Sequence, residues 1–105
     1  MAYHFIGIKG TGMAALACIL RDEKKEVAGS DIEKYIFTED ALRSRGIPIY
    51  PFDPANIHDH DTVIIGLSFD RSNPEVAAAM DNPTVKTYYY NEYLGILLKR
   101  YNSIC

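Results

Sequence analysis

Short apolar runs of strand type alternate with helical stripes along the whole of this 105-residue sequence. Parallel strands need long crossover connections, usually helices, so this alternation limits the possible folds more than any other feature. Five runs have strand character, and they lie at residues 3–8, 26–29, 47–50, 62–66 and 84–87. The fourth run, TVIIG, is continuously apolar, which is typical of a central strand covered on both faces. The sequence therefore predicts an α/β fold, in which one domain contains an open parallel five-stranded sheet with helices on both faces.

Apolar spacing and capping residues predict the first two helices. Helical spacing follows the first strand at Met13, Leu16, Ala17 and Leu20. The second helix is expected over residues 38–45, with Thr38 as its N-cap and Gly46 as its C-cap. Residues 51–61 are polar and contain two prolines, so they predict a loop with one helical turn.

Two further helices are expected in the second half of the chain. Pro74 fits the first position of the third helix, which follows the N-cap Asn73 and runs to about Met80. Asn91 is the expected N-cap of the last helix. One face of that helix carries Tyr93, Leu94, Leu97, Leu98 and Tyr101.

The overall composition excludes several classes of protein. Apolar residues make up 48% of the chain, enough for a core, and the formal charge of −3 argues against non-specific nucleic-acid binding. No apolar run reaches the length of a membrane span and no signal-peptide pattern opens the chain, so no membrane partner is expected. Cys18 and Cys105 form no CxxC pair, and we interpret them as a small buried hydrophobe and a terminal thiol. The expected location is the reducing cytoplasm.

The turn between the first strand and the first helix is rich in glycine. Residues 10–15, GTGMAA, fit the pattern G-x-G-x-x-A in the strand–turn–helix context that this pattern requires. Gly10 is expected to permit the tight turn and Gly12 to let a ligand approach the backbone. A helix start presents unpaired N–H groups, and Lys9 adds a positive charge beside it. The motif predicts a Rossmann-like site for a diphosphate nucleotide; the alternative is that the glycines serve only a tight turn and close helix packing.

Asp31 follows the second predicted strand, 21 residues after Gly10. A carboxylate at this place commonly accepts hydrogen bonds from ribose hydroxyls, and Ser30 beside it is a second candidate for that contact. The alternative for Asp31 is an ordinary residue of a surface turn. Up to this point the fingerprint fits NAD as well as a nucleotide sugar.

Other polar clusters carry weaker signals. The HDHD sequence at residues 58–61 lacks the further ligands of a zinc site, so we interpret it as a solvated loop, and no metal site is predicted. His4, inside the first strand, has no nucleophile partner; it is either a core histidine with its hydrogen bonds satisfied or a residue near the strand edge. The tyrosines of TYYYNEYL, residues 87–94, are assigned to packing rather than to stacking on a base. No catalytic residue is predicted.

Three segments of the sequence resemble the amino-terminal domain of the Mur ligases, which build peptidoglycan. They are HFIGIKGTGMAALACIL, VAGSDIEKYIFTEDALRSRGI and NPEV, and the resemblance extends over essentially all 105 residues. It is strongest to the branch that joins L-alanine to UDP-N-acetylmuramate, and Gly12 favours that branch over the enzyme that recycles muropeptides. In this family the domain binds the UDP part of the substrate and not NAD.

The resemblance implies a set of UDP-binding residues. The phosphate loop corresponds to Lys9, Gly10, Thr11, Gly12 and Met13, and the end of the second strand to Ser30 and Asp31. The second wall of the uridine site corresponds to residues 66–73, with Ser68 and Phe69 as contacts. The chain departs from the family at Lys9, where a glycine is common, and at residues 66–69, GLSF, where the family often has SSA and an aliphatic residue.

The resemblance also implies what lies outside the chain. An ATP-binding glycine-rich loop is expected just beyond residue 105, in a central domain that a carboxyl-terminal domain follows. In the full-length ligase, ATP and Mg²⁺ activate the muramoyl carboxylate for attack by alanine. This domain itself needs no cofactor; its partners are UDP-N-acetylmuramate and the remaining ligase domains, and alone it is expected to bind without turnover. The alternatives are a free-standing NAD-binding or nucleotide-sensing domain and an interaction module that has lost its ligand.

Overall fold

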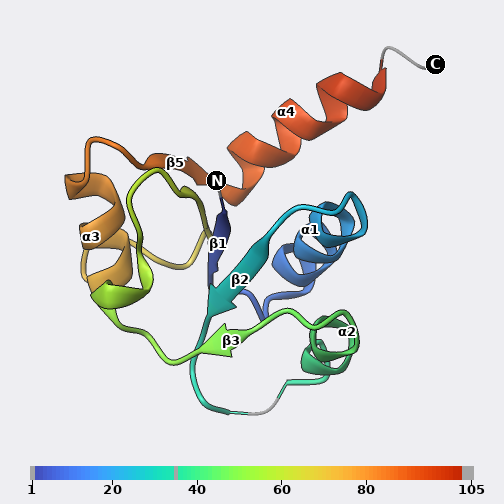
Figure 1. Cartoon of the computed structure of the whole chain (residues 1–105), viewed down its shortest axis with the longest axis horizontal. Coiled ribbons are helices and arrows are strands. Elements are labelled where there is room, and N and C mark those ends of the chain that lie inside the picture. Colours follow the sequence, from blue (N-terminus) through green and yellow to red (C-terminus); the bar gives the residue numbers. More distant parts are fainter. Residues whose placement is uncertain (1, 35, 103–105) are drawn as a thin grey trace.

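Five parallel strands form a single sheet in the computed structural model, which describes residues 2–34 and 36–102. The strands are β1 (Tyr3–Ile6), β2 (Val27–Ser30), β3 (Ile49–Tyr50), β4 (Thr62–Ile65) and β5 (Lys86–Tyr89). Their order across the sheet is β3-β2-β1-β4-β5, and every pairing is parallel (Figure 1). The predicted fold class is confirmed.

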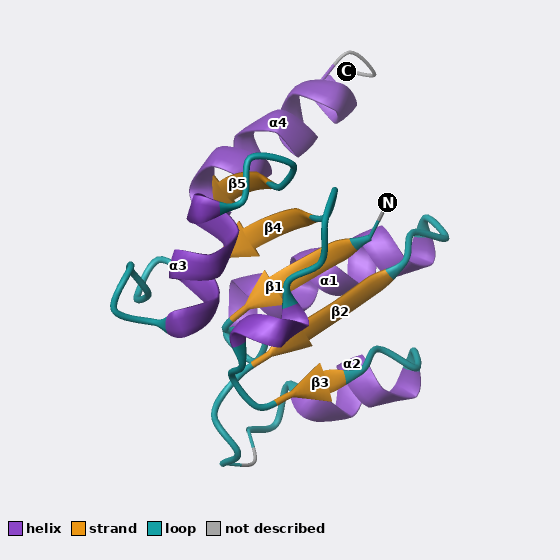
Figure 2. Ribbon diagram, turned by 60° about the vertical axis from the view of Figure 1, so that its left-hand side comes forward, coloured by secondary structure: helices purple, strands orange, loops and turns teal. Residues whose placement is uncertain are grey.

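Helices cover both faces of this sheet, as the sequence predicts. They are α1 (Thr11–Asp22), α2 (Glu39–Ser44), α3 (Pro74–Asp81) and α4 (Tyr90–Asn102), with a short 3₁₀ turn η1 (Pro54–Asn56). Figure 2 shows α1 and α2 behind the sheet and α3 in front of it. In Figure 1, α4 runs away from the sheet toward the carboxyl terminus. Among the described residues, no helix is long and apolar enough to cross a membrane.

Two hydrophobic cores lie on opposite faces of the sheet. The first core packs α1, α2 and α4 against the sheet and includes Phe5, Leu16, Leu42 and Leu97. The second packs α3 against the other face and includes Ile6, Val63 and Val76. All four residues of β4 are buried, which confirms the prediction of a strand covered on both sides.

Several predicted boundaries shift for local reasons. The first strand ends at Ile6 instead of residue 8, because Gly7 turns the chain with a φ of +85°. The fifth strand begins at Lys86 instead of residue 84, because Thr84 bonds to the Asn82 side chain in a turn. The third strand is shorter than predicted and covers only Ile49–Tyr50.

The predicted caps have mixed outcomes. Asn73 accepts hydrogen bonds from Glu75 N and Val76 N at the start of α3, so this N-cap is confirmed. Thr38 occupies the N-cap position of α2, but its hydroxyl donates to the carbonyl of Lys9 and makes no capping bond.

The N-cap predicted for the last helix is wrong. The helix begins at Tyr90, before Asn91, and the Glu92 carboxylate accepts the Tyr89 N–H. On the apolar face predicted for this helix, Tyr93 and Leu97 are buried, whereas Leu98 is 56% exposed. The side chain of Tyr101 and all of Cys105 lie outside the described residues.

Candidate functional site: a cleft at the carboxyl ends of β1 and β4

β1 and β4 are neighbours, and the connections that follow them leave toward opposite faces of the sheet. Such a switch point is where open α/β sheets bind ligands, beyond the carboxyl ends of the strands. A cleft of about 340 Å³ lies there. It is lined by Gly7, Gly10, Thr11, Gly12, Met13, Asp31, Ile36, Gly66, Leu67, Ser68, Phe69 and Tyr90. The structure therefore brings together most of the residues that the sequence nominated.

The loop after β1 delivers the amino terminus of α1 to this cleft. Gly7 N donates to Ser30 O at 2.9 Å and Gly10 N to Gly7 O at 3.1 Å, which closes a tight turn. Gly10 is the N-cap of α1, and in the described part of the chain no side chain caps this helix and no acidic residue lies in its first turn. The first N–H groups of an α-helix have no partner within the helix, and such a helix start is a favourable position for an anion.

The tight turn is located at Gly7, and the expectation that Gly10 provides it is corrected. Gly10 has an ordinary φ of −60°, whereas Gly7 has a φ of +85°. A Cβ on Gly7 would also lie 2.4 Å from Cε2 of Phe69. The positive φ and this close contact therefore each exclude a larger residue at this position. In the sequence, the signal for this turn was Gly7, the first of the three closely spaced glycines at residues 7, 10 and 12.

Asp31 lines the cleft on the β2 side. It is 8% exposed, and its Oδ2 accepts the Lys9 N–H at 2.9 Å while Oδ1 accepts the Ile32 N–H at 2.7 Å. A carboxylate offers about four lone-pair sites, so these two bonds orient Asp31 and leave acceptor capacity toward the cleft.

The Lys9 side chain points away from the cleft, contrary to the sequence expectation. Its ammonium is buried, forms an ion pair with Glu39, and donates to the carbonyls of Ile32 at 2.8 Å and Lys34 at 2.9 Å. The hydrogen bond from Lys9 holds the pKa of Glu39 below its ordinary value, although burial acts in the opposite direction. Lys9 thus ties the glycine loop to the chain that follows β2.

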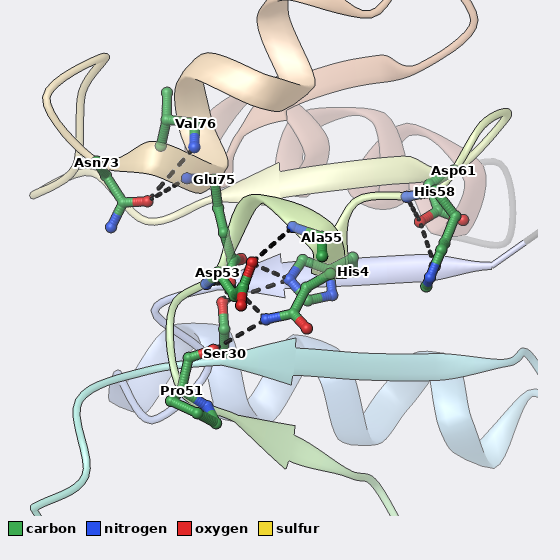
Figure 3. A network of polar contacts seen from close by, with 11 residues as sticks. His4, Ser30, Pro51, Asp53, Ala55, His58, Asp61, Asn73, Glu75 and Val76 are labelled. Carbon is green, nitrogen blue, oxygen red and sulfur yellow. Dashed lines mark hydrogen bonds and ion pairs between the residues drawn. The ribbon is translucent and has the colours of Figure 1, made fainter.

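Ser30 also points elsewhere. Its side chain is fully buried on the α3 side of the sheet, where the hydroxyl donates to Oε1 of Glu75. Figure 3 shows that it belongs to a polar network around Glu75. It does not line the cleft.

The Glu75 network joins three parts of the fold. The Glu75 side chain is fully buried. Besides the Ser30 hydroxyl, its Oε1 accepts a hydrogen bond from His4 Nε2 at 2.7 Å (Figure 3). Its Oε2 accepts from Asp53 N at 3.0 Å and from Asn56 Nδ2 at 2.8 Å. Burial raises the pKa of Glu75, but these hydrogen bonds outweigh it and hold the pKa below the ordinary value. His4 is therefore a core histidine with its hydrogen bonds satisfied, one of the two readings that the sequence left open.

The segment after β4 forms the opposite wall of the cleft. Ser68 and Phe69 line it, as expected, and the Phe69 ring packs edge-on against Phe52 with centroids 5.5 Å apart. Sequence reasoning did not nominate Tyr90, which enters the cleft from the start of α4. Its position directly after the fifth strand was the available signal, because that strand also ends at this edge of the sheet.

A larger cavity of about 460 Å³ lies elsewhere, and Ala2, Glu26 and Asp61 from the amino ends of strands are among its lining residues. Ligands of open parallel sheets bind beyond the opposite ends, so the smaller cleft is the candidate site. His58 also lines the larger cavity. Its backbone N–H donates to Asp61 Oδ2, and this hydrogen bond within the HDHD segment stabilises the loop.

The sheet order, the uncapped helix start and the carboxylate after β2 define a Rossmann-like domain. A family model described as "Mur ligase family, catalytic domain" matches residues 2–102, so the chain belongs to the Mur ligase family. It is 51% identical over 104 residues to the UDP-N-acetylmuramate–L-alanine ligase of Pediococcus pentosaceus, and this match covers 97% of the chain and 23% of the relative. It is 49% identical over 102 residues to the enzyme of the same name from Levilactobacillus brevis, with the same coverage.

Two solved structures resemble the chain. UDP-N-acetylmuramate-alanine ligase MurC from Thermotoga maritima superposes with a TM-score of 0.84 at 35% identity, covering 95% of this chain and 23% of the other. UDP-N-acetylmuramate:L-alanyl-gamma-D-glutamyl-meso-diaminopimelate ligase from Neisseria meningitides gives a TM-score of 0.74 at 31% identity, covering 89% and 29%. The chain thus spans about a quarter of the length of these relatives.

Proposed function

We propose that this chain is the substrate-binding domain of a UDP-N-acetylmuramate–L-alanine ligase and that its cleft holds the UDP portion of the substrate. One observation carries the proposal: the amino terminus of α1 opens into the switch-point cleft without a side-chain cap among the described residues. This arrangement suits a diphosphate. The relatives named for this ligase, at about 50% identity, support the choice of nucleotide.

The proposed pose follows the walls of the cleft. The diphosphate lies against the N–H groups of residues 11–13, and the ribose lies toward Asp31 on the β2 side. Ser68 and Phe69 form the facing wall. Lys9 and Ser30 act without touching the ligand, Lys9 by fixing the loop through its N–H bond to Asp31 and Ser30 by anchoring Glu75.

The rest of the reaction belongs to other parts of a longer ligase. The relatives are more than four times longer than the matched segment, so we propose that further domains complete the enzyme and bind ATP and Mg²⁺. This domain needs no cofactor of its own to hold the nucleotide, and alone it binds without ligation. The rival function, a free-standing NAD-binding or sensing domain, has no support among the relatives described above, which are ligases.

An amide NMR titration tests the ligand. UDP and UDP-N-acetylmuramate are expected to shift the amides of residues 10–13 and 66–69, whereas uridine, which lacks the diphosphate, shifts the glycine loop much less. The proposal fails if NAD shifts residues 10–13 at a lower concentration than either uridine nucleotide. It also fails if UDP shifts only residues around the larger cavity.

A substitution at Thr11 isolates the amide donors. Thr11 is the first residue of α1, where proline is tolerated, and Gly10 before it has the extended conformation (ψ 145°) that proline requires. Thr11→Pro therefore removes one N–H from the cleft without breaking the helix. UDP affinity measured by calorimetry is expected to fall about tenfold or more, as for loss of a hydrogen bond to a charged group. Thr11→Ala is the matched control, because it removes the hydroxyl and keeps the N–H; an equal loss in both variants would contradict the role of the amide.

A further inference from the structure

Tyr90 lines the cleft from the β5 side of the sheet, whereas Asp31 lines it from the β2 side. Tyr90 is the first residue of α4 and directly follows β5, so its half-buried side chain comes from a distant part of the chain to the start of α1. A Cβ placed on Gly12 would lie only 2.6 Å from Tyr90 Oη and 2.8 Å from Tyr90 Cζ. The phenol hydroxyl therefore lies beside the first turn of α1, where the proposed function places the diphosphate.

The described lining residues of the cleft include no cationic side chain, so an anion bound there depends on neutral hydrogen-bond donors. Asp31 is the one charged side chain among its described lining residues, and the Lys9 ammonium is engaged outside the cleft by Glu39 and two carbonyls. An anion held here must rely on main-chain N–H groups and on hydroxyl groups. The hydroxyls that line the cleft belong to Thr11, Ser68 and Tyr90.

The hydroxyl of Tyr90 is available for such a contact. It forms no hydrogen bond with any residue that the structure describes, whereas Tyr93, on the same helix, donates to the hydroxyl of Tyr3. A hydroxyl that donates to a phosphate oxygen makes a charge-assisted bond, about twice as strong as a neutral one.

We infer that the Tyr90 hydroxyl donates a hydrogen bond to a phosphate oxygen bound at the amino terminus of α1, and that position 12 is glycine to leave room for this ring. The inference rests on the proposed function and names a further binding residue for it. It also revises the sequence interpretation of Gly12, whose open side is filled by protein rather than left to the ligand.

Removing the hydroxyl alone tests the contact. Tyr90→Phe is expected to weaken UDP binding about tenfold in calorimetry and to leave uridine binding unchanged, because uridine has no phosphate. Tyr88→Phe is the matched control: Tyr88 also lies at the end of β5, but its ring packs on Tyr93 in the first core, outside the cleft. Tyr88→Phe is expected to alter neither affinity. The inference is overturned if Tyr90→Phe binds UDP as the unmodified protein does, or if it weakens uridine and UDP equally.

A double substitution tests the reason for glycine at position 12. Gly12→Ala is expected to weaken UDP binding by displacing the ring, and to have no further effect when Tyr90→Ala has already removed that ring. If Gly12→Ala causes the same loss in both backgrounds, Gly12 is bare for the ligand and this part of the inference fails. Amide spectra of each variant confirm that it is folded.

The controls separate the inference from the proposed function. If the unmodified protein binds UDP with shifts at residues 10–13 while Tyr90→Phe loses nothing, the inference about Tyr90 fails alone. If the unmodified protein does not bind UDP, both the proposed function and the inference about Tyr90 fail.

Discussion

At the scale of single residues, Glu75 shows how the chain holds a buried charge. Four donors surround its carboxylate: His4 Nε2, Ser30 Oγ, Asp53 N and Asn56 Nδ2. They come from β1, β2 and the segment around η1, whereas Glu75 belongs to the first turn of α3. The network therefore fixes the start of the helix that the wall residues Ser68 and Phe69 precede.

We predict that Glu75→Gln destabilises the domain by about 2 kcal/mol, because the amide has one accepting oxygen instead of two and no negative charge for the four donors. Urea denaturation near pH 7 measures the loss. Glu26→Gln, at an exposed glutamate, is the control and is expected to stay within about 0.5 kcal/mol. A loss of similar size in both variants would show that the hydrogen-bond network around Glu75 does not account for the loss of stability.

The lowered pKa of Glu75 also predicts how stability depends on pH. Its hydrogen bonds favour the charged form in the folded state, so its contribution is complete above the ordinary glutamate pKa of about 4.3. That contribution is lost as the pH falls through the lower folded value. Urea midpoints of the unmodified protein should therefore fall more steeply below about pH 5 than those of Glu75→Gln. Some slope is expected to remain in the variant, since the pKa of Glu39 is also lowered by Lys9.

At the scale of elements, two glycines in regular structure have different roles. Gly29 lies in β2, and a Cβ there would be 2.5 Å from Cδ1 of Ile8 and 2.9 Å from the Phe5 carbonyl oxygen. Gly95 lies in α4 with no atom within 4 Å of the corresponding position. The first glycine lets the loop after β1 pass close over β2 on its way to the cleft, and the second has no packing role among the described residues.

We predict opposite signs for the same substitution at these two positions. Gly29→Ala is expected to cost about 1–3 kcal/mol, because Ile8 and the β1 backbone have to move. Gly95→Ala is expected to stabilise the domain by about 0.5–1 kcal/mol, since alanine loses less backbone freedom in a helix. Thermal melts of the two variants give both values, and destabilisation by Gly95→Ala would contradict the open surroundings of that residue.

At the scale of the whole molecule, the two cores share one sheet. Phe5 of β1 belongs to the first core and its neighbour Ile6 to the second, because successive strand residues point to opposite faces. Neither core can lose its packing without disturbing strands that also support the other. The domain should therefore unfold as one cooperative unit.

Hydrogen exchange after a substitution in one core tests this cooperativity. Val76→Ala in the second core is expected to lower stability by about 2 kcal/mol. The slowest amides of α1, which packs only in the first core, should lose the same protection. Met80→Ala, at a residue 36% exposed on the same helix, is the control with a smaller effect. If α1 keeps its protection in Val76→Ala, the cores unfold separately.

The sequence by itself determined the fold class, the number of strands, the position of the glycine loop and the nomination of Asp31. These follow from period and local chemistry: apolar spacing sets helix or strand, and a glycine-rich turn between them precedes an uncapped helix start. Family resemblance added Ser68, Phe69 and the expected ligand.

Only the tertiary structure decided where individual side chains point. Alternation along a strand places Ser30 and Asp31 on opposite sides, but which of them faces the cleft depends on the sheet's register and on what covers each face. The direction of Lys9 depends on Glu39, thirty residues further along the chain, and the neighbour of Gly12 is Tyr90, seventy-eight residues away. Contacts between residues so far apart in the chain leave no local pattern, because they form only when the sheet brings its strand ends to one edge.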